Sequence, residues 1–239
     1  MGQLIRADDF ESAWQLADSV SGWLTRAQGQ LLWAAALRLP PGALAVEIGS
    51  HQGRSTIVLG AAARVVDVRL AAIDPFVDGA MFGGAATRQR FEDNIRSAGL
   101  TEVVELTVGY STRLRGNWNQ PIALLYVDGK HDYWTFTDDL RWSAHMAAGG
   151  DILVHDCFSS VGVTLGVLAK VLCGSRYRYV ERAGSLARFR LATPTVGDRV
   201  RLLAQLPWFA RNVVIKTLLY CRLRGLARLL GHDSPYAPY

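Results

Sequence analysis

Blocks of apolar and polar residues alternate along the chain and predict a regular succession of strands and helices. Short apolar runs predict buried strands at 43–48, 68–73, 103–108, 122–127 and 151–154. Apolar residues at helical spacing predict helices at 53–63, 87–98, 132–147 and 161–172, with a short polar turn or helix after residue 108. This alternation predicts one mostly parallel, doubly wound α/β sheet of the Rossmann-like type.

Other patterns flank this alternation at both ends. Residues 8–38 predict two N-terminal helices, and Pro40 and Pro41 end the second one. Residues 177–190 predict a closing hairpin that supplies an antiparallel edge to the sheet. Leucines and arginines at helical spacing fill residues 195–230. We therefore predict an N-terminal helical cap at 1–40, a central α/β domain at 41–192 and a basic helical extension at 193–239.

The charge of the chain is concentrated at its C-terminal end. The formal net charge is +5, but residues 1–194 carry 19 basic and 19 acidic side chains, whereas residues 195–239 carry 7 basic and 2 acidic ones. The body therefore lacks the basic surface of a nucleic-acid-binding protein, and we predict no nucleic-acid partner. Three cysteines without metal-site spacing suggest reduced thiols and a cytoplasmic protein.

The basic extension allows two interpretations. Its arginines and leucines could lie on an anionic membrane, which would place the protein at the inner face of the membrane as a peripheral protein. Alternatively, its apolar face packs on the body or on a partner subunit while its arginines face solvent. The apolar surface of the N-terminal helices and the extension also predicts a homodimer.

A glycine-bearing turn follows the first predicted strand of the sheet. The segment 46–56 reads VEIGSHQGRST, in which Gly49 and Gly53 let the backbone approach a ligand closely. Glu47 supplies a carboxylate, and the amides at the start of the next helix can hold an anion. The spacing E-x-G-x-x-x-G differs from the G-x-G-x-x-G that cradles a pyrophosphate in dinucleotide-binding proteins. A ligand with a carboxylate and no phosphate suits this turn better.

Further candidate ligand contacts follow the next two strands. Asp74 closes the second strand, where an acid commonly binds ribose hydroxyls. Ser111 belongs to the segment VGYST after the third strand, where an adenine ring could lie against the backbone. The alternative for Asp74 is a turn-starting role before Pro75.

Acids and histidines follow the fourth and fifth strands. Asp128 ends the run LYVD, and His131 comes three residues later; His155 and Asp156 end the run DILVHD. Because the ends of neighbouring parallel strands face the ligand crevice, we expect these four side chains to lie together. Asp128 and Asp156 offer the oxygen ligands that Mg²⁺ or Mn²⁺ prefers, with His155 as a third ligand or an orienting group. His131 is the candidate base for an alcohol proton.

These motifs together resemble class I S-adenosylmethionine-dependent methyltransferases. The resemblance rests on E-x-G-x-x-x-G followed by Ser-Thr, an acid closing strand two, D-G-x-H-x-Y and G-G-x-I-x-x-H-D, and it covers about residues 40–192. It is strongest to metal-dependent sugar O-methyltransferases of the macrolide-sugar and mycobacterial polysaccharide type. The chain lacks the N-P-P-Y signature of N-methyltransferases, which favours an oxygen acceptor.

The resemblance implies a role for each motif residue. The methionine part of S-adenosylmethionine would be held by Glu47, Gly49, Ser50, Gly53 and Ser55; Asp74 would bind the ribose, Ser111 would lie near the adenine, and Asp128 would line the cofactor site. Metal ligands would be Asp128, His155 and Asp156, although His155 stands where many relatives have an acid. His131 would be the general base.

The implied acceptor is a saccharide or another small molecule with a hydroxyl group. A catechol or phenol is the main alternative, because the same acids can chelate a diol. A nicotinamide-dependent oxidoreductase and a non-catalytic cofactor-binding interaction module are the remaining alternatives. A glycine-containing lid at 76–86 would cover the acceptor, and aromatic side chains could stack on a sugar face: Tyr133, Trp134, Phe158 and, although it fits the core better, Trp142.

Overall fold

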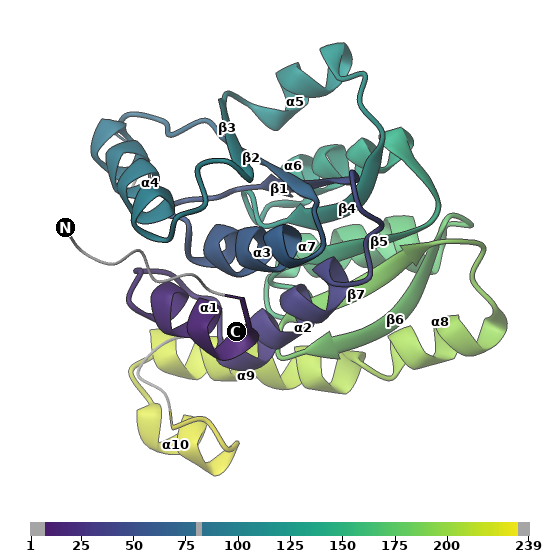
Figure 1. The fold of residues 1–239 in the computed structure, drawn as a ribbon. Helices are drawn as coiled ribbons and strands as arrows, with labels where there is room; N and C mark the ends of the chain where they lie inside the picture. Colours follow the sequence, from purple (N-terminus) through teal and green to yellow (C-terminus); the bar gives the residue numbers. More distant parts are fainter. Residues whose placement is uncertain (1–7, 80–82, 234–239) are drawn as a thin grey trace.

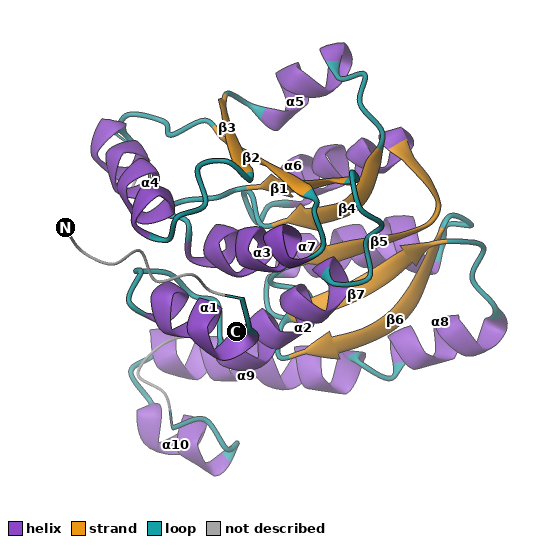
Figure 2. Cartoon of the chain, viewed as in Figure 1, coloured by secondary structure: helices purple, strands orange, loops and turns teal. Residues whose placement is uncertain are grey.

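The computed structural model describes residues 8–79 and 83–233, and in this part of the chain a single seven-stranded sheet lies between helices (Figures 1 and 2). The strand order is β3-β2-β1-β4-β5-β7-β6. The strands are β1 (Leu44–Ile48), β2 (Arg69–Asp74), β3 (Val104–Val108), β4 (Ile122–Val127), β5 (Met146–Val154), β6 (Tyr177–Ala183) and β7 (Leu186–Leu191). β1 to β5 pair in parallel, and β7 is antiparallel to both of its neighbours. The predicted α/β fold is confirmed.

Helices cover both faces of the sheet, and each face has its own apolar core. They are α1 (Phe10–Asp18), α2 (Arg26–Ala36), α3 (Arg54–Val65), α4 (Ala85–Ser97), α5 (Ser111–Leu114), α6 (Tyr133–Asp139), α7 (Val161–Val167), α8 (Val196–Leu203), α9 (Leu206–Tyr220) and α10 (Arg224–Leu229). Helices α1 to α4 pack on one face, whereas α6 and α7 pack on the other, as Figure 1 shows. The central strands are therefore buried on both sides, which explains their continuous apolar runs.

A capping box begins the second N-terminal helix, and one arginine joins the N-terminal segment to α3. Thr25 begins α2 with a capping box, in which its side chain and that of Gln28 each bind the other residue's backbone. Arg54, the first residue of α3, donates to the carbonyl oxygens of Leu24 (3.0 Å) and Val20 (2.8 Å). The predicted pair of helices at 8–38 therefore packs over α3 rather than standing apart.

The structure differs from the predicted elements around the fifth strand. The helix expected at 132–147 is only α6 followed by a 3₁₀ helix, Leu140–His145, and β5 begins at Met146 rather than at residue 151. The pairing of β4 with β5 shifts register between Ile122 and Leu124, opposite an exposed segment with Gly149 at φ +89°. The glycine pair expected to end a helix thus forms a bulge, where left-handed backbone is needed.

The predicted closing hairpin is confirmed and lies at one edge of the sheet. Its second strand, β7, pairs with β5, and its first strand, β6, is the edge strand. β7 is buried along nearly its whole length, whereas Arg178 and Glu181 of β6 are exposed. The more buried strand of the hairpin is therefore the internal one.

The C-terminal extension packs on the body through α9. Ile215 and Asn212 are fully buried, and Trp208 and Phe209 contact the core on the α7 side of the sheet. In Figure 1, α10 lies apart from the sheet, and its Leu229 is 81% exposed. Packing on the body therefore holds for α9, while membrane contact through α10 and the homodimer stay predictions. No helix among the described residues is long and apolar enough to cross a membrane.

Candidate functional site

The predicted site residues gather at the carboxyl ends of β1, β4 and β5, which are neighbours in the sheet. The chain runs outward from β1 through β2 to β3 and then returns to β4 on the other side of β1. The crevice between β1 and β4 is thus the switch point at which open α/β sheets bind ligands. The backbone links continue past the strands, because the Asp128 amide donates to the Ile48 carbonyl (2.8 Å) and the His155 amide to the Val127 carbonyl (3.0 Å).

The glycine turn after β1 packs directly against the loop after β4. Gly49 has φ +90°, and a Cβ atom added there would lie 2.1 Å from the Asp128 carbonyl oxygen. Gly53, at φ +91°, begins α3 against Phe91. Ser50 is buried, and its side chain lies near Glu47. A close backbone approach between two loops fits the predicted cofactor site.

Asp74 organises this turn. One of its carboxylate oxygens accepts from the amides of Ser50 (3.0 Å) and His51 (2.9 Å), and the other accepts from the amide of Phe76 (2.8 Å). The carboxylate that was predicted to bind ribose therefore also ties the end of β2 to the glycine turn. Its contact with ribose stays a prediction.

Glu47 is fully buried beneath the same turn. Its carboxylate accepts hydrogen bonds from the hydroxyls of Ser55 (2.5 Å) and Thr56. Burial raises the pKa of Glu47 to about 7, although the surrounding hydroxyls oppose this shift. In this structure Glu47 and Ser55 bind each other, and their predicted contact with a cofactor stays a prediction.

Replacing Glu47 by glutamine is expected to stabilise the cofactor-free protein above pH 7 and to change little at pH 4. A raised folded-state pKa contributes stability below the unfolded value of about 4.5, and this contribution is lost as the pH rises through about 7. The unfolding free energy of Glu47→Gln minus that of the wild-type protein should therefore increase by roughly 3 kcal/mol from pH 4 to above pH 7. Urea unfolding across this pH range measures this difference, and the exposed Glu105→Gln serves as the control. Parallel pH curves for Glu47→Gln and the wild-type protein would contradict the prediction.

The acids and histidines after β4 and β5 form one compact cluster. Ligand atoms of Asp128, His131 and His155 lie within 4.8 Å of one another. His131 Nδ1 is 2.9 Å from Asp156 Oδ2, and its Nε2 is 3.3 Å from Asp128 Oδ1. His155 Nδ1 is 3.2 Å from the same Asp128 oxygen and 3.5 Å from Asp156 Oδ1. All four predicted side chains are thus brought together, with His131 inside the group that could hold a metal.

The charges of this cluster shift its pKa values in opposite directions. Burial disfavours the protonated form of His131, but hydrogen bonds to Asp128 and Asp156 outweigh it and raise the pKa of His131 to about 10. Burial likewise opposes a charged Asp128, yet the neighbouring histidines lower its pKa below its usual range. The Tyr126 hydroxyl donates to the second Asp128 oxygen at 2.9 Å and helps to hold that carboxylate in place.

The cluster fits a divalent metal. His155 is 3% exposed, and its Nδ1 lies within ion-pair distance of Asp128 and Asp156. Its Nε2 has neither a hydrogen bond nor an ion pair in the described part of the chain, and a buried ring nitrogen without a partner is costly unless something binds it. A carboxylate oxygen and imidazole nitrogens together suit Mn²⁺ and other borderline metals at least as well as Mg²⁺.

Two supporting contacts were not predicted from the sequence. The Ser111 hydroxyl donates to Asp139 (2.5 Å), an almost fully buried acid whose pKa burial raises to about 6. Gln28 of α2 donates to the Ser185 hydroxyl (3.0 Å), which in turn lies 3.5 Å from Asp156. The only sequence signal for Asp139 was an acid on the apolar face of its helix; no local pattern marks Gln28 or Ser185.

The predicted acceptor contacts are only partly available. Trp142 is fully buried, which confirms its predicted place in the core. Phe158 is also fully buried, so its predicted stacking on a sugar is wrong. Trp134 is 76% exposed and Tyr133 lies beside it, so both remain accessible. The lid predicted at 76–86 includes residues 80–82, which lie outside the described residues.

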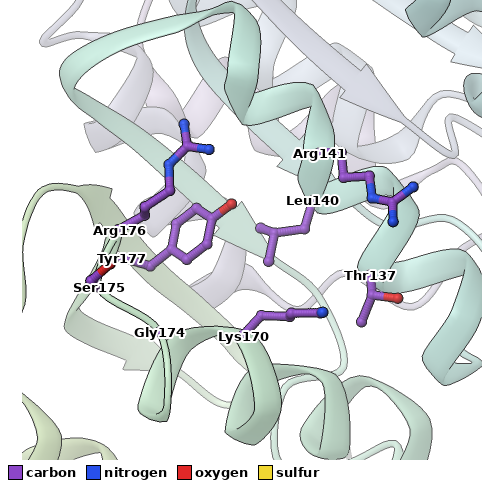
Figure 3. Close-up of a pocket in the computed structure, with 8 residues that line it drawn as sticks. All are labelled: Thr137, Leu140, Arg141, Lys170, Gly174, Ser175, Arg176 and Tyr177. Atoms are coloured by element: carbon purple, nitrogen blue, oxygen red, sulfur yellow. The ribbon is translucent and has the colours of Figure 1, made fainter.

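Figure 3 shows a cavity of about 300 Å³ that shares no residue with this site. It lies between the end of α6 and the start of β6, and its lining includes Arg141, Lys170 and Arg176. β6 begins where β5 begins, because β7 runs antiparallel to both strands. The cavity therefore lies near the amino end of β5, whereas the four-residue cluster lies at its carboxyl end.

Comparisons with known proteins agree with this geometry. Residues 46–157 match the family model described as a methyltransferase domain. An O-methyltransferase from Streptomyces achromogenes, TomG, solved with S-adenosylmethionine, is 18% identical with a TM-score of 0.56 over 77% of this chain and 89% of that one. An O-methyltransferase from Bacillus cereus, solved with S-adenosylhomocysteine, is 16% identical with a TM-score of 0.56 over 77% and 90%. At these identities the solved structures show a shared fold.

Proposed function

We propose that the chain is a class I S-adenosylmethionine-dependent methyltransferase that methylates a hydroxyl group of a sugar with the help of a divalent metal, and the match of residues 46–157 to a methyltransferase-domain model supports this. The observation that carries this proposal is the buried imidazole of His155, whose Nδ1 lies 3.2 Å from Asp128 and whose Nε2 has no partner among the described residues. A metal held there would face a ligand bound at the switch point of the sheet.

Each group of residues has one task in this reaction. S-adenosylmethionine supplies the methyl group as a positively charged sulfonium, and a bound Mg²⁺ or Mn²⁺ lowers the pKa of the acceptor hydroxyl. Asp128 and His155 would hold the metal, with Asp156 beside them as a third ligand. The turn at Gly49 and Ser50 would position the methyl donor, so that the acceptor oxygen lies in line with the methyl group.

A divalent metal held by Asp128 would favour the neutral form of His131, and the neutral imidazole would then accept the hydroxyl proton. Its Nδ1 faces Asp156, which can orient the ring as a carboxylate does in other acid–base pairs, while Nε2 faces the metal side of the cluster. Because Asp156 has one oxygen near His155 and the other near His131, a single carboxylate can serve both the metal and the base.

A catechol or phenol is the alternative acceptor, since a metal between Asp128 and His155 could also chelate a diol. Incubation with S-adenosylmethionine, Mg²⁺ or Mn²⁺, and a panel of mannosides, glucosides and catechols tests the two acceptor classes. We expect release of S-adenosylhomocysteine with a saccharide and its loss after EDTA treatment. Calorimetry that finds binding of NAD⁺ and none of S-adenosylhomocysteine would overturn the methyltransferase proposal, and binding of neither would favour a non-catalytic module.

Replacing His131 by alanine distinguishes a base from a metal ligand. If His131 is the base, kcat should fall by about 10²- to 10⁴-fold while Mn²⁺ affinity, measured by calorimetry, stays close to that of the wild-type protein. A His145→Ala variant, which removes a histidine outside the cluster, serves as the control. A large loss of Mn²⁺ affinity in His131→Ala would instead make His131 a ligand, and near wild-type turnover would exclude both roles.

A further inference from the structure

The C-terminal helix α9 holds the loop that follows Asp156. Asn212 is fully buried, and its side-chain amide donates to the Phe158 carbonyl at 3.1 Å. One turn later, the Lys216 ammonium donates to the Ser159 carbonyl at 2.9 Å. These two side chains fix the position of α9 against the carboxyl end of β5, although the extension is remote from it in sequence.

The loop between Asp156 and α7 is strained and is tied to the predicted base. Asp156 (φ +55°) and Phe158 (φ +59°) both have left-handed backbone, which is uncommon for residues other than glycine. The Ser160 hydroxyl donates to the His131 carbonyl at 2.8 Å. α9, this loop and the His131 segment therefore form one continuous structure beside the four-residue cluster.

A second cavity of about 300 Å³ opens between α9 and the beginning of α7. It is lined by Ser159, Val161, Val213, Lys216, Thr217 and Tyr220. Val161 and Tyr220 are exposed, and Val213 is half-buried, so apolar side chains face solvent around this opening. The volume is at the lower end of the range for small-molecule sites, which are mostly apolar with a few placed polar groups.

Among the described residues that line this cavity, Lys216 is the only charged one. It is half-buried, its ammonium group binds the Ser159 carbonyl through one of three donors, and it forms no direct ion pair with a described residue, although Asp156 is close enough to act on its charge. An ammonium group that is partly withdrawn from water and has two further donors can bind an anionic group. The cavity thus combines an apolar wall with one anion contact.

We propose that this cavity binds the non-reacting part of the methyl acceptor, and that this part is an apolar alkyl or aryl group with an acidic substituent that contacts Lys216. The proposal rests on the proposed methyl transfer and adds the class of acceptor, which is an amphiphilic anion. It also assigns the basic extension a role in acceptor binding, because α9 supplies four of the six described residues that line the cavity.

Anilinonaphthalene sulfonate, an apolar aryl sulfonate whose fluorescence rises in apolar sites, is the probe for the full-length protein. We expect saturable binding of one equivalent that persists with saturating S-adenosylhomocysteine. Lys216→Met should weaken binding by about tenfold or more, as loss of a charged hydrogen bond implies. Lys216→Arg should retain most of the affinity, and Val213→Trp, which fills the cavity, should abolish binding even though Lys216 remains.

Lys170→Met is the matched control, because it removes the same charge from the other cavity, which is shown in Figure 3 and lies near the amino end of β5. Equal weakening by Lys170→Met and Lys216→Met, unchanged binding in Val213→Trp, or displacement of the probe by S-adenosylhomocysteine would each overturn the proposed cavity site. Calorimetry with S-adenosylhomocysteine on the same variants separates the two proposals. If S-adenosylhomocysteine binds but the cavity variants bind the probe as the wild-type protein does, only the proposed acceptor class is wrong. If S-adenosylhomocysteine does not bind, the proposed methyl transfer is wrong.

Discussion

Asp128→Asn is expected to reduce kcat/KM for methyl transfer on the order of 10³-fold and to remove metal dependence. One Asp128 oxygen faces both His131 and His155, and it is the only carboxylate oxygen in the metal-compatible group of described residues. An amide in its place removes the negative charge that would hold the metal. Metal ions contribute several kcal/mol to such reactions, and each 1.36 kcal/mol changes the rate tenfold.

The asparagine variant should fold, because its amide oxygen can still accept from Tyr126 and Asp156 still pairs with His131. It should lose some stability, because His131 and His155 each lose one carboxylate partner. Mn²⁺ calorimetry and initial rates over a range of Mn²⁺ concentrations measure the effect. Asp93→Asn, which changes only exposed contacts with Arg96 and Gln89, should behave like the wild-type protein. Metal-dependent turnover of Asp128→Asn within about tenfold of wild type would show that Asp128 is not the ligand.

Gly49→Ala is expected to lower the melting temperature by on the order of 10 °C and to abolish cofactor binding. A Cβ atom at this position would lie 2.1 Å from the Asp128 carbonyl oxygen and 2.8 Å from the Gly129 amide nitrogen. The backbone of both loops must move to relieve this overlap. Left-handed backbone adds about 1–2 kcal/mol for a residue other than glycine. A total of about 3–5 kcal/mol corresponds to this shift in a chain of this size.

Gly42→Ala separates the two contributions. Gly42 also has positive φ (+77°), but no atom lies within 4 Å of its added Cβ. This control should therefore show only the backbone cost, about 1–2 kcal/mol. Thermal unfolding and S-adenosylhomocysteine calorimetry on both variants measure the difference. Equal loss of stability in the two variants would mean that the glycine turn does not depend on its close contact with the β4 loop.

Local sequence signals predicted most of the fold. Continuous apolar runs identified the strands, because strands covered on both faces need no polar side. The same signals failed at Gly149 and Gly150, since a glycine pair ends a helix as readily as it forms a bulge. The burial of β7 inside the sheet was also missed, because the order of strands depends on how tightly each one packs against its neighbours.

By itself the sequence determined the α/β class and the location of the chemistry, since residues that directly follow buried parallel strands must meet at one edge of the sheet. It therefore placed Asp128, His131, His155 and Asp156 at one site. Only the tertiary structure decided that His131 lies between two carboxylates and that the Nε2 atom of His155 has no partner among the described residues. It also decided that α9 reaches the loop after Asp156. These contacts join residues far apart in the chain, and no local pattern encodes them, because they depend on how the layers pack.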